Sequence, residues 1–192
     1  MSIIEDSHKL VETRISSTEV FDGRLLHVFF DEARLPDGSQ STREWIKHPG
    51  ASAVLPVFPD GDIMLVKQFR YPVSQIFYEV PAGKIDPGET ADGTAGRELR
   101  EEAGLSCRRF HYLGHFYPSI GYTDEIIHLY VAWDIDEYEQ AVDEDEFLVK
   151  ERVPFREAVE MVHTGVISDG KTAITLLRAW KWWQEEGPFQ VK

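Results

Sequence analysis

Short runs of apolar, β-branched and aromatic residues, separated by turn-forming residues, occupy the first eighty positions of the chain. Runs of this kind are typical of β-strands. The Pro-Asp-Gly segment at 36–38 supplies turn chemistry, and the Pro-Asp-Gly-Asp segment at 59–62, between two strongly apolar runs, predicts a hairpin. The predicted strands are residues 11–20, 24–35, 42–48, 53–58, 63–69 and 76–80.

The spacing of the apolar residues changes after residue 90. Apolar residues recur at every fourth position from Ala91 to Ala103, which predicts a helix over Thr90–Ala103 with Gly104 as its C-cap. Beyond it, strands are predicted at 110–117 and 126–133, and helices at 154–163 and 171–185 with the segment 165–170 between them.

Eight of the thirteen residues from Asp134 to Glu146 are acidic, which predicts a solvated loop. Strands and helices do not alternate simply along the chain. The order of elements therefore favours an α+β fold, or a sandwich of helices on a mixed sheet, over a doubly wound fold.

Composition narrows the class of protein. A chain of 192 residues that is 42% hydrophobic supports one globular domain, with room for a small appended subdomain. No run approaches eighteen apolar residues, so we expect no membrane span, and the polar segment Met1–Lys9 has no secretory signal pattern. Cys107 is the single cysteine, which excludes an internal disulfide and a cysteine-rich zinc site and favours the reducing cytoplasm.

The charge balance bears on possible partners. The chain has 20 basic and 34 acidic residues, a formal net charge of −14, and no run of Lys and Arg. Such a chain repels nucleic-acid backbones, so no nucleic acid is expected as a partner. If the ligand is itself anionic, a local cation must mediate its binding.

The most informative chemistry lies in the predicted helix over residues 90–103. Glu98, Glu101 and Glu102 fall at positions i, i+3 and i+4, so the three carboxylates project from nearly one face. Hard divalent cations such as Mg²⁺ use oxygen ligands of this kind and relieve the repulsion between them. On this triplet alone, a solvated glutamate-rich helix is the commoner interpretation. The turn at 86–89 brings Glu89 toward the helix, and Arg97 is placed to pair with a carboxylate.

The complete segment from Gly83 to Leu105 reads GKIDPGETADGTAGRELREEAGL. It resembles, position for position, the signature of the Nudix hydrolases, G-x5-E-x7-R-E-U-x-E-E-x-G-U, in which U is aliphatic. The resemblance implies an α/β/α sandwich around a mixed sheet, with the signature forming a loop–helix–loop metal site. It also implies hydrolysis of a nucleoside diphosphate linked to another group, with Mg²⁺ or Mn²⁺ as cofactor.

The same resemblance implies roles for the residues of the signature. Glu98 and Glu102 would be the main metal ligands, and Glu101 would assist in catalysis. The carbonyl oxygen of Ala82 would be a further metal ligand, and Arg97 would orient the carboxylates. Glu89 would support the helix or join the metal network. Gly83 and Gly104 are the glycines of the signature.

The flanking segments suggest a branch of the family. Five segments outside the signature together resemble the ADP-ribose pyrophosphatase and nucleoside diphosphate-sugar hydrolase branch. They are residues 47–51, 67–71 and 78–83, the downstream segment YPSIGYTDE at 117–125, and GVISDGKT at 165–172. The resemblance covers about residues 15–180. In the commoner form of the downstream motif, a proline stands where this chain has Ile120, a departure that bears on the sugar preference.

The branch resemblance implies further site residues, each with a structural alternative. Arg70 and Arg43 match arginines that contact the ligand, and the structural alternative for each is a surface ion pair with one of the abundant acids. Glu125 matches a catalytic glutamate on a mobile loop, and its neighbour Asp124 is the alternative general base. Ser119 and Glu79 would bind substrate or be structural. Candidates for stacking on the base, which the sequence does not rank, are Phe21, Leu25 and Trp45.

The predicted activity is hydrolysis of the diphosphate linkage of a nucleoside diphosphate sugar, in the first place ADP-ribose to AMP and ribose 5-phosphate. The alternatives are another substrate of the family, such as GDP-mannose, and a non-catalytic module that senses a nucleotide. Residues 1–48 are predicted to form an N-terminal antiparallel β subdomain and 49–192 the hydrolase domain. Since three strands cannot form a core alone, a homodimer that exchanges the N-terminal strands is expected, as in the resembling branch.

Overall fold

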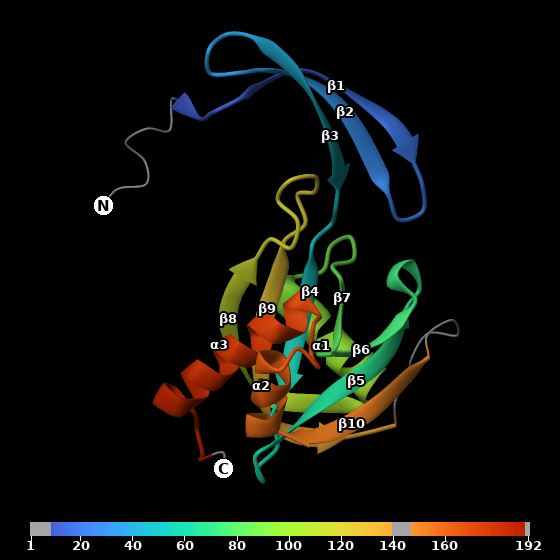
Figure 1. Ribbon diagram of the computed structural model, residues 1–192. Coiled ribbons are helices and arrows are strands. Elements are labelled where there is room, and N and C mark those ends of the chain that lie inside the picture. Colours follow the sequence, from blue (N-terminus) through green and yellow to red (C-terminus); the bar gives the residue numbers. More distant parts are fainter. Residues whose placement is uncertain (1–8, 140–146, 191–192) are drawn as a thin grey trace. The chain divides into compact units, whose positions relative to one another are not determined.

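The computed structural model describes residues 9–139 and 147–190, and the chain divides into two compact units (Figure 1). The first unit comprises Met1–His48 and Ser119–Glu125, and the second comprises Pro49–Pro118 and Ile126–Lys192. Within the described residues, no helix is long and apolar enough to cross a membrane.

The first unit is an antiparallel sheet in the order β1 (Thr13–Asp22), β2 (His27–Arg34) and β3 (Gln40–Lys47). Every residue of β1 is exposed. The segment 119–125 pairs with the end of β3, because Ile46 donates its N–H to Tyr122 O at 2.8 Å and accepts the Asp124 N–H at 3.3 Å. Loop residues distant in sequence are thereby attached to the N-terminal strands.

The second unit contains two sheets. The first is mixed, in the order β7 (Ala82–Lys84), β4 (Ala51–Pro56), β9 (Ile127–Glu137) and β8 (Leu105–Phe116), with β4 parallel to β9 and the other pairs antiparallel. The second is antiparallel, in the order β10 (Leu148–Pro154), β5 (Asp62–Arg70) and β6 (Gln75–Glu79), and the 3₁₀ turn η2 (Tyr71–Val73) joins its last two strands.

Strand β4 is buried along its whole length, because helices cover both faces of its sheet (Figure 1). Successive side chains of a strand point to opposite faces. Leu55 therefore packs with α2 (Phe155–His163) and α3 (Gly170–Glu186), while Val54 packs with α1 (Ala91–Ala103). This is the predicted α/β/α sandwich around a mixed sheet.

Local signals at both ends determine where α1 begins and ends. The Thr90 side chain accepts a hydrogen bond from the Gly93 N–H, and Gly104 ends the helix in the left-handed conformation with φ of 66°. Ala95 and Leu99 are completely buried against the sheet. Because the apolar side of this helix packs on the sheet, the side that bears the carboxylates is held in one orientation.

Three features differ from the sequence prediction. Strands β7 and β10 were not predicted, since β7 is only three residues long and β10 carries three consecutive charged residues, 150–152. The prediction of an acidic loop is wrong for the first residues of that segment, because Asp134–Glu137 belong to β9, which pairs with β8. Inter-strand hydrogen bonding outweighs the polarity of these side chains. Residues 140–146 of the same acidic segment lie outside the described residues.

Candidate active site

Two glutamates of α1 lie against the backbone of the β7 strand. A Cβ atom added to Gly83 would overlap the carboxylate of Glu98 and would have to displace it. The N–H of Ala82 donates to Glu102 Oε2 at 2.9 Å. Glu98 is 7% exposed and Glu102 4% exposed. Both carboxylates are therefore held beside Ala82, next to the carbonyl that the resemblance names as a third oxygen ligand.

Arg97 links the carboxylate of Glu98 to those of Glu89 and Glu101. Its Nη1 donates to Glu98 Oε1 at 2.7 Å and to Glu101 Oε2 at 2.8 Å. Its Nε donates to Glu89 Oε1 at 3.0 Å, and its Nη2 donates to the carbonyl oxygen of Lys84 at 3.1 Å. One guanidinium thus links the loop before α1 to two carboxylates on the helix.

Glu89 is kept ionised by its neighbours. The Arg97 guanidinium, followed by the Thr94 hydroxyl, lowers the pKa of Glu89 to about 2. Hydrogen bonding to Glu89, followed by the Glu101 and Glu98 carboxylates, raises the pKa of Arg97. The carboxylates gathered around this arginine outnumber it, so the segment keeps an excess of negative charge.

The residues of the segment fit a divalent metal ion. Every donor is an oxygen atom, from buried carboxylates and the Ala82 carbonyl, which suits a hard cation such as Mg²⁺. The absent Cβ at Gly83 leaves space that the Glu98 carboxylate fills beside that carbonyl. Burial of two like charges is unfavourable unless a cation compensates them. Glu98, Glu102 and Ala82 are thus suited to hold one.

Arg70 is anchored by a buried carboxylate. At the end of β5, its Nε donates to Glu79 Oε1 at 2.7 Å and its Nη2 donates to Glu79 Oε2 at 2.6 Å. The side chain of Glu79 is only 3% exposed, whereas that of Arg70 is 43% exposed. Hydrogen bonding to Glu79 raises the pKa of Arg70, and the charges of Glu102 and Asp169 act in the same direction. Glu79 thus orients Arg70, and Arg70 is close enough to Glu102 for the two charges to interact.

Two residues of this site were given no role by the sequence analysis. Lys171 Nζ contacts Glu79 Oε2 and lies 3.0 Å from Asp169 Oδ2. Asp169 caps α3, accepting the N–H of Thr172 at 3.0 Å and its hydroxyl at 2.6 Å. In the sequence, the segment SDGKT at 168–172 shows that Asp169 can cap a helix, but no local pattern connects this segment to Glu79.

The same side chains surround a cavity. Its volume is about 400 Å³, and it is lined by Arg70, Val73, Phe77, Glu79, Ser168, Asp169, Gly170 and Lys171.

Arg43, Ser119 and Glu125 lie in the first unit. Arg43 donates to Glu12 through Nε at 2.9 Å and through Nη2 at 2.5 Å. Arg43 also lines a cavity of about 420 Å³ together with Trp45, whose ring stacks on Phe29 at a centroid distance of 5.0 Å. Of the three candidates for base stacking, Trp45 lines this cavity, while Phe21 and Leu25 are exposed.

The two neighbouring acids of the 119–125 segment have different contacts. Asp124 Oδ1 accepts the N–H of His48 at 2.7 Å, which ties the segment to the end of β3. The Glu125 carboxylate lies 3.8 Å from His48 Nδ1, beyond hydrogen-bond distance. The Ser119 carbonyl accepts the Tyr122 and Thr123 N–H groups and forms the turn that precedes them. Asp124 is thus a structural anchor of the segment.

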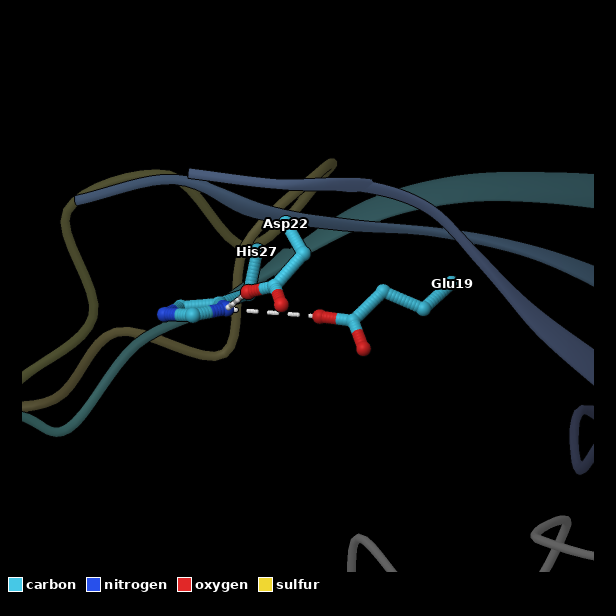
Figure 2. A group of neighbouring side chains, drawn as sticks. All are labelled: Glu19, Asp22 and His27. Atoms are coloured by element: carbon cyan, nitrogen blue, oxygen red, sulfur yellow. Dashed lines mark hydrogen bonds and ion pairs between the residues drawn. The ribbon is translucent and has the colours of Figure 1, made fainter. Parts of the chain in front are cut away.

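A histidine and two acids meet at the β1–β2 hairpin (Figure 2). His27 Nδ1 lies 2.9 Å from Asp22 Oδ1 and 3.3 Å from Glu19 Oε1. A β-bulge between Glu19 and Phe21 brings Glu19 and Asp22 to the same imidazole. Glu19 and Asp22 are exposed and His27 is half-buried, so the three side chains form a polar cluster at the surface.

Comparisons with known proteins identify a domain family over most of the chain. The NUDIX domain model matches residues 47–180. The ADP-ribose pyrophosphatase of Bacillus subtilis (strain 168) is 38% identical over 169 residues, which cover 87% of this chain and 91% of that protein. The methanol dehydrogenase activator of Bacillus methanolicus is 40% identical over 171 residues, covering 88% and 92%.

A solved structure described as an ADP compounds hydrolase superposes with a TM-score of 0.82 and covers 94% of this chain and 98% of that one. Its sequence identity of 22% makes it a likeness of fold alone. The matched domain, which includes the whole signature segment, and the relatives above 30% identity establish that the chain belongs to the Nudix family.

Proposed function

We propose that this Nudix pyrophosphohydrolase hydrolyses ADP-ribose to AMP and ribose 5-phosphate with Mg²⁺ as cofactor. The observation that carries the proposal is the placement of the Glu98 and Glu102 carboxylates beside the Ala82–Gly83 backbone. The similarity to an ADP-ribose pyrophosphatase over most of both chains supports the substrate. Mn²⁺ has the same preference for oxygen ligands and is the alternative cofactor.

In this proposal, Glu98, Glu102 and the Ala82 carbonyl hold the metal ion. When bound, the ion neutralises phosphate oxygens, orients water and stabilises charge that builds on the leaving oxygen. Arg97 keeps Glu98 and Glu101 in one orientation, because its Nη1 bonds both carboxylates. Arg70, oriented by Glu79, offers its guanidinium to the diphosphate.

The general base in this proposal is Glu125. Its neighbour Asp124 already accepts the His48 N–H, whereas the Glu125 carboxylate is beyond hydrogen-bond distance of the nearby imidazole. A carboxylate on a closing loop removes the proton from the attacking water. Arg43 and Ser119, also in the first unit, are proposed to contact substrate.

The oligomer belongs to the same proposal. Strand β1 is exposed along its length and presents Ile15, Val20 and Phe21 to solvent. Exposed apolar residues on an edge strand favour association with another chain. We propose a homodimer in which residues 1–48 exchange and complete the partner's substrate site, and a cytoplasmic location, in keeping with the free thiol of Cys107.

GDP-mannose is a second candidate substrate, because a GDP-mannose pyrophosphatase of Yersinia enterocolitica is 32% identical over 136 residues. Ile120, which stands where the commoner downstream motif has its second proline, lines the cavity in the first unit and is 82% exposed, and this departure bears on the sugar preference. A non-catalytic sensing role has less support, because every glutamate of the signature is present.

A panel of substrates with Mg²⁺ tests the proposal. ADP-ribose, GDP-mannose, diadenosine polyphosphates and nucleoside triphosphates are compared by kcat/KM. The highest value is expected for ADP-ribose. A higher kcat/KM for GDP-mannose would make GDP-mannose the proposed substrate. Absence of turnover with every compound of the panel would support the sensing role.

A further inference from the structure

Lys171 lies on the first turn of α3, where it contacts the carboxylate that orients Arg70. Its Nζ contacts Glu79 Oε2 and lies 3.0 Å from Asp169 Oδ2, and its side chain is 14% exposed. Glu79 Oε2 therefore receives donors from both Arg70 and Lys171. A single buried carboxylate is shared by two cations.

The hydrogen bonds leave part of the Arg70 guanidinium available. Of its five N–H groups, those of Nε and one of Nη2 point to Glu79. Within residues 9–139 and 147–190, Nη1 of Arg70 has no hydrogen-bond partner. Because Arg70 and Lys171 line the same cavity of about 400 Å³, an anion in it can meet these donors.

The charges explain why a second cation matters. Arg70 and Glu79 alone form a neutral pair, which attracts an anion weakly. Lys171 adds a positive charge beside the same carboxylate, and Asp169, whose Oδ2 lies 3.0 Å from Lys171 Nζ, adds a negative one. The four side chains are together neutral with Lys171 present, whereas Arg70, Glu79 and Asp169 without it carry a net negative charge that repels an anion.

We propose that Lys171 is a positioning residue for the substrate: by neutralising Glu79, it leaves the charge of Arg70 available to the diphosphate while Glu79 holds the guanidinium in place. This inference rests on the proposed function, in which Arg70 contacts the diphosphate. Because that contact exists before and during the reaction, losing it raises KM more than it lowers kcat.

The first experiment compares Lys171→Met, Lys171→Arg and, as a control on the same helix, Lys181→Met. Lys181 is exposed and pairs only with Glu185 among the described residues. With ADP-ribose and Mg²⁺, Lys171→Met is expected to raise KM about tenfold or more, the effect of one charge-assisted hydrogen bond, with kcat within about threefold. Lys171→Arg and Lys181→Met are expected to stay within about threefold of the original chain.

The second experiment tests the route through Arg70. In a double-mutant cycle, Lys171→Met is expected to add less than about twofold to the KM of Arg70→Gln. An unchanged KM for Lys171→Met, an equal rise for Lys181→Met, or independent effects in the cycle would overturn the inference. If Lys171→Met does not fold, Lys171→Gln takes its place, since its amide donates to Glu79 without a charge.

Calorimetric binding of inorganic pyrophosphate with Mg²⁺ separates this inference from the proposed function. Lys171→Met is expected to weaken this binding about tenfold, whether or not ADP-ribose is the substrate. Equal affinity in the original chain and in Lys171→Met would refute the role of Lys171. Failure to cleave ADP-ribose with the affinity difference intact would refute the substrate alone.

Discussion

Asp124 and Glu125 are adjacent acids whose side chains have different tasks. Asp124 Oδ1 accepts the N–H of His48, and an asparagine at this position keeps an oxygen that can accept the same bond. Glu125 is the proposed general base. We therefore predict that Glu125→Gln lowers kcat about 10² to 10⁴-fold with little change in metal or substrate binding, while Asp124→Asn has a small effect.

Steady-state kinetics of both variants measure this difference. A large loss in Asp124→Asn together with near-normal kcat in Glu125→Gln would exchange the two assignments. A loss in Glu125→Gln that appears mainly as weaker Mg²⁺ affinity would make Glu125 a metal ligand.

Cys107 is predicted to be unreactive in the folded protein. Burial raises the pKa of its thiol to about 12, so the neutral thiol predominates at pH 7 and the thiolate forms only in strongly alkaline solution. Alkylation by iodoacetamide at pH 7.5 is expected to be much slower in native protein than in guanidinium chloride. Equal rates in the two states would show that the thiol is accessible and ionisable.

Gly83, in strand β7 before α1, leaves room for the Glu98 carboxylate because glycine has no side chain. A Cβ at Gly83 would overlap the Glu98 carboxylate, whereas a Cβ at Gly96 on α1 meets no atom within 4 Å. We predict that Gly83→Ala displaces Glu98 and lowers kcat/KM strongly. Gly96→Ala is predicted to stabilise the protein by about 0.5 to 1 kcal/mol through helix propensity and to leave activity unchanged.

Kinetics and thermal unfolding of the two glycine variants check this prediction. If Gly83→Ala keeps full activity, Glu98 does not need its place beside Ala82, and the metal-ligand assignment loses its main support.

Sequence predicted those elements whose signals are local. Thr90 and Gly104 mark the ends of α1 directly, and the predicted and observed helices agree within one residue. Strand β10 was missed because its stability comes from pairing with β5, as between Glu151 and Leu65, which a pattern of charged residues does not reveal.

The candidate site shows the same division between local and distant contacts. The carboxylates of α1 and Arg97 lie within one continuous segment, so their proximity could be predicted. The contact between Lys171 and Glu79 joins residues 92 positions apart and depends on how α3 packs near β6. The shared use of Glu79 by two cations therefore required the tertiary structure.

Association of two chains is predicted from the exposed N-terminal strands. The chain is expected to sediment as a homodimer at micromolar concentration, because β1 presents apolar side chains that a monomer leaves in water. Sedimentation velocity with activity measured at the same concentration checks this prediction. A fully active monomer would exclude strand exchange as a requirement of the site.

The central claim is that the carboxylates of α1 support Mg²⁺-dependent cleavage within the diphosphate of ADP-ribose. Its most direct test is chromatographic analysis of the products formed from ADP-ribose by the original chain and by Glu102→Gln. Glutamine has nearly the same size as glutamate and keeps an oxygen for the Ala82 N–H, so the fold and its unfolding temperature should be retained.

The original chain is expected to yield AMP and ribose 5-phosphate in equal amounts, only with a divalent cation, and Glu102→Gln to be slower by several orders of magnitude. The account would be contradicted by ADP and ribose as products, by turnover without a divalent cation, or by more than about a tenth of the original activity in folded Glu102→Gln.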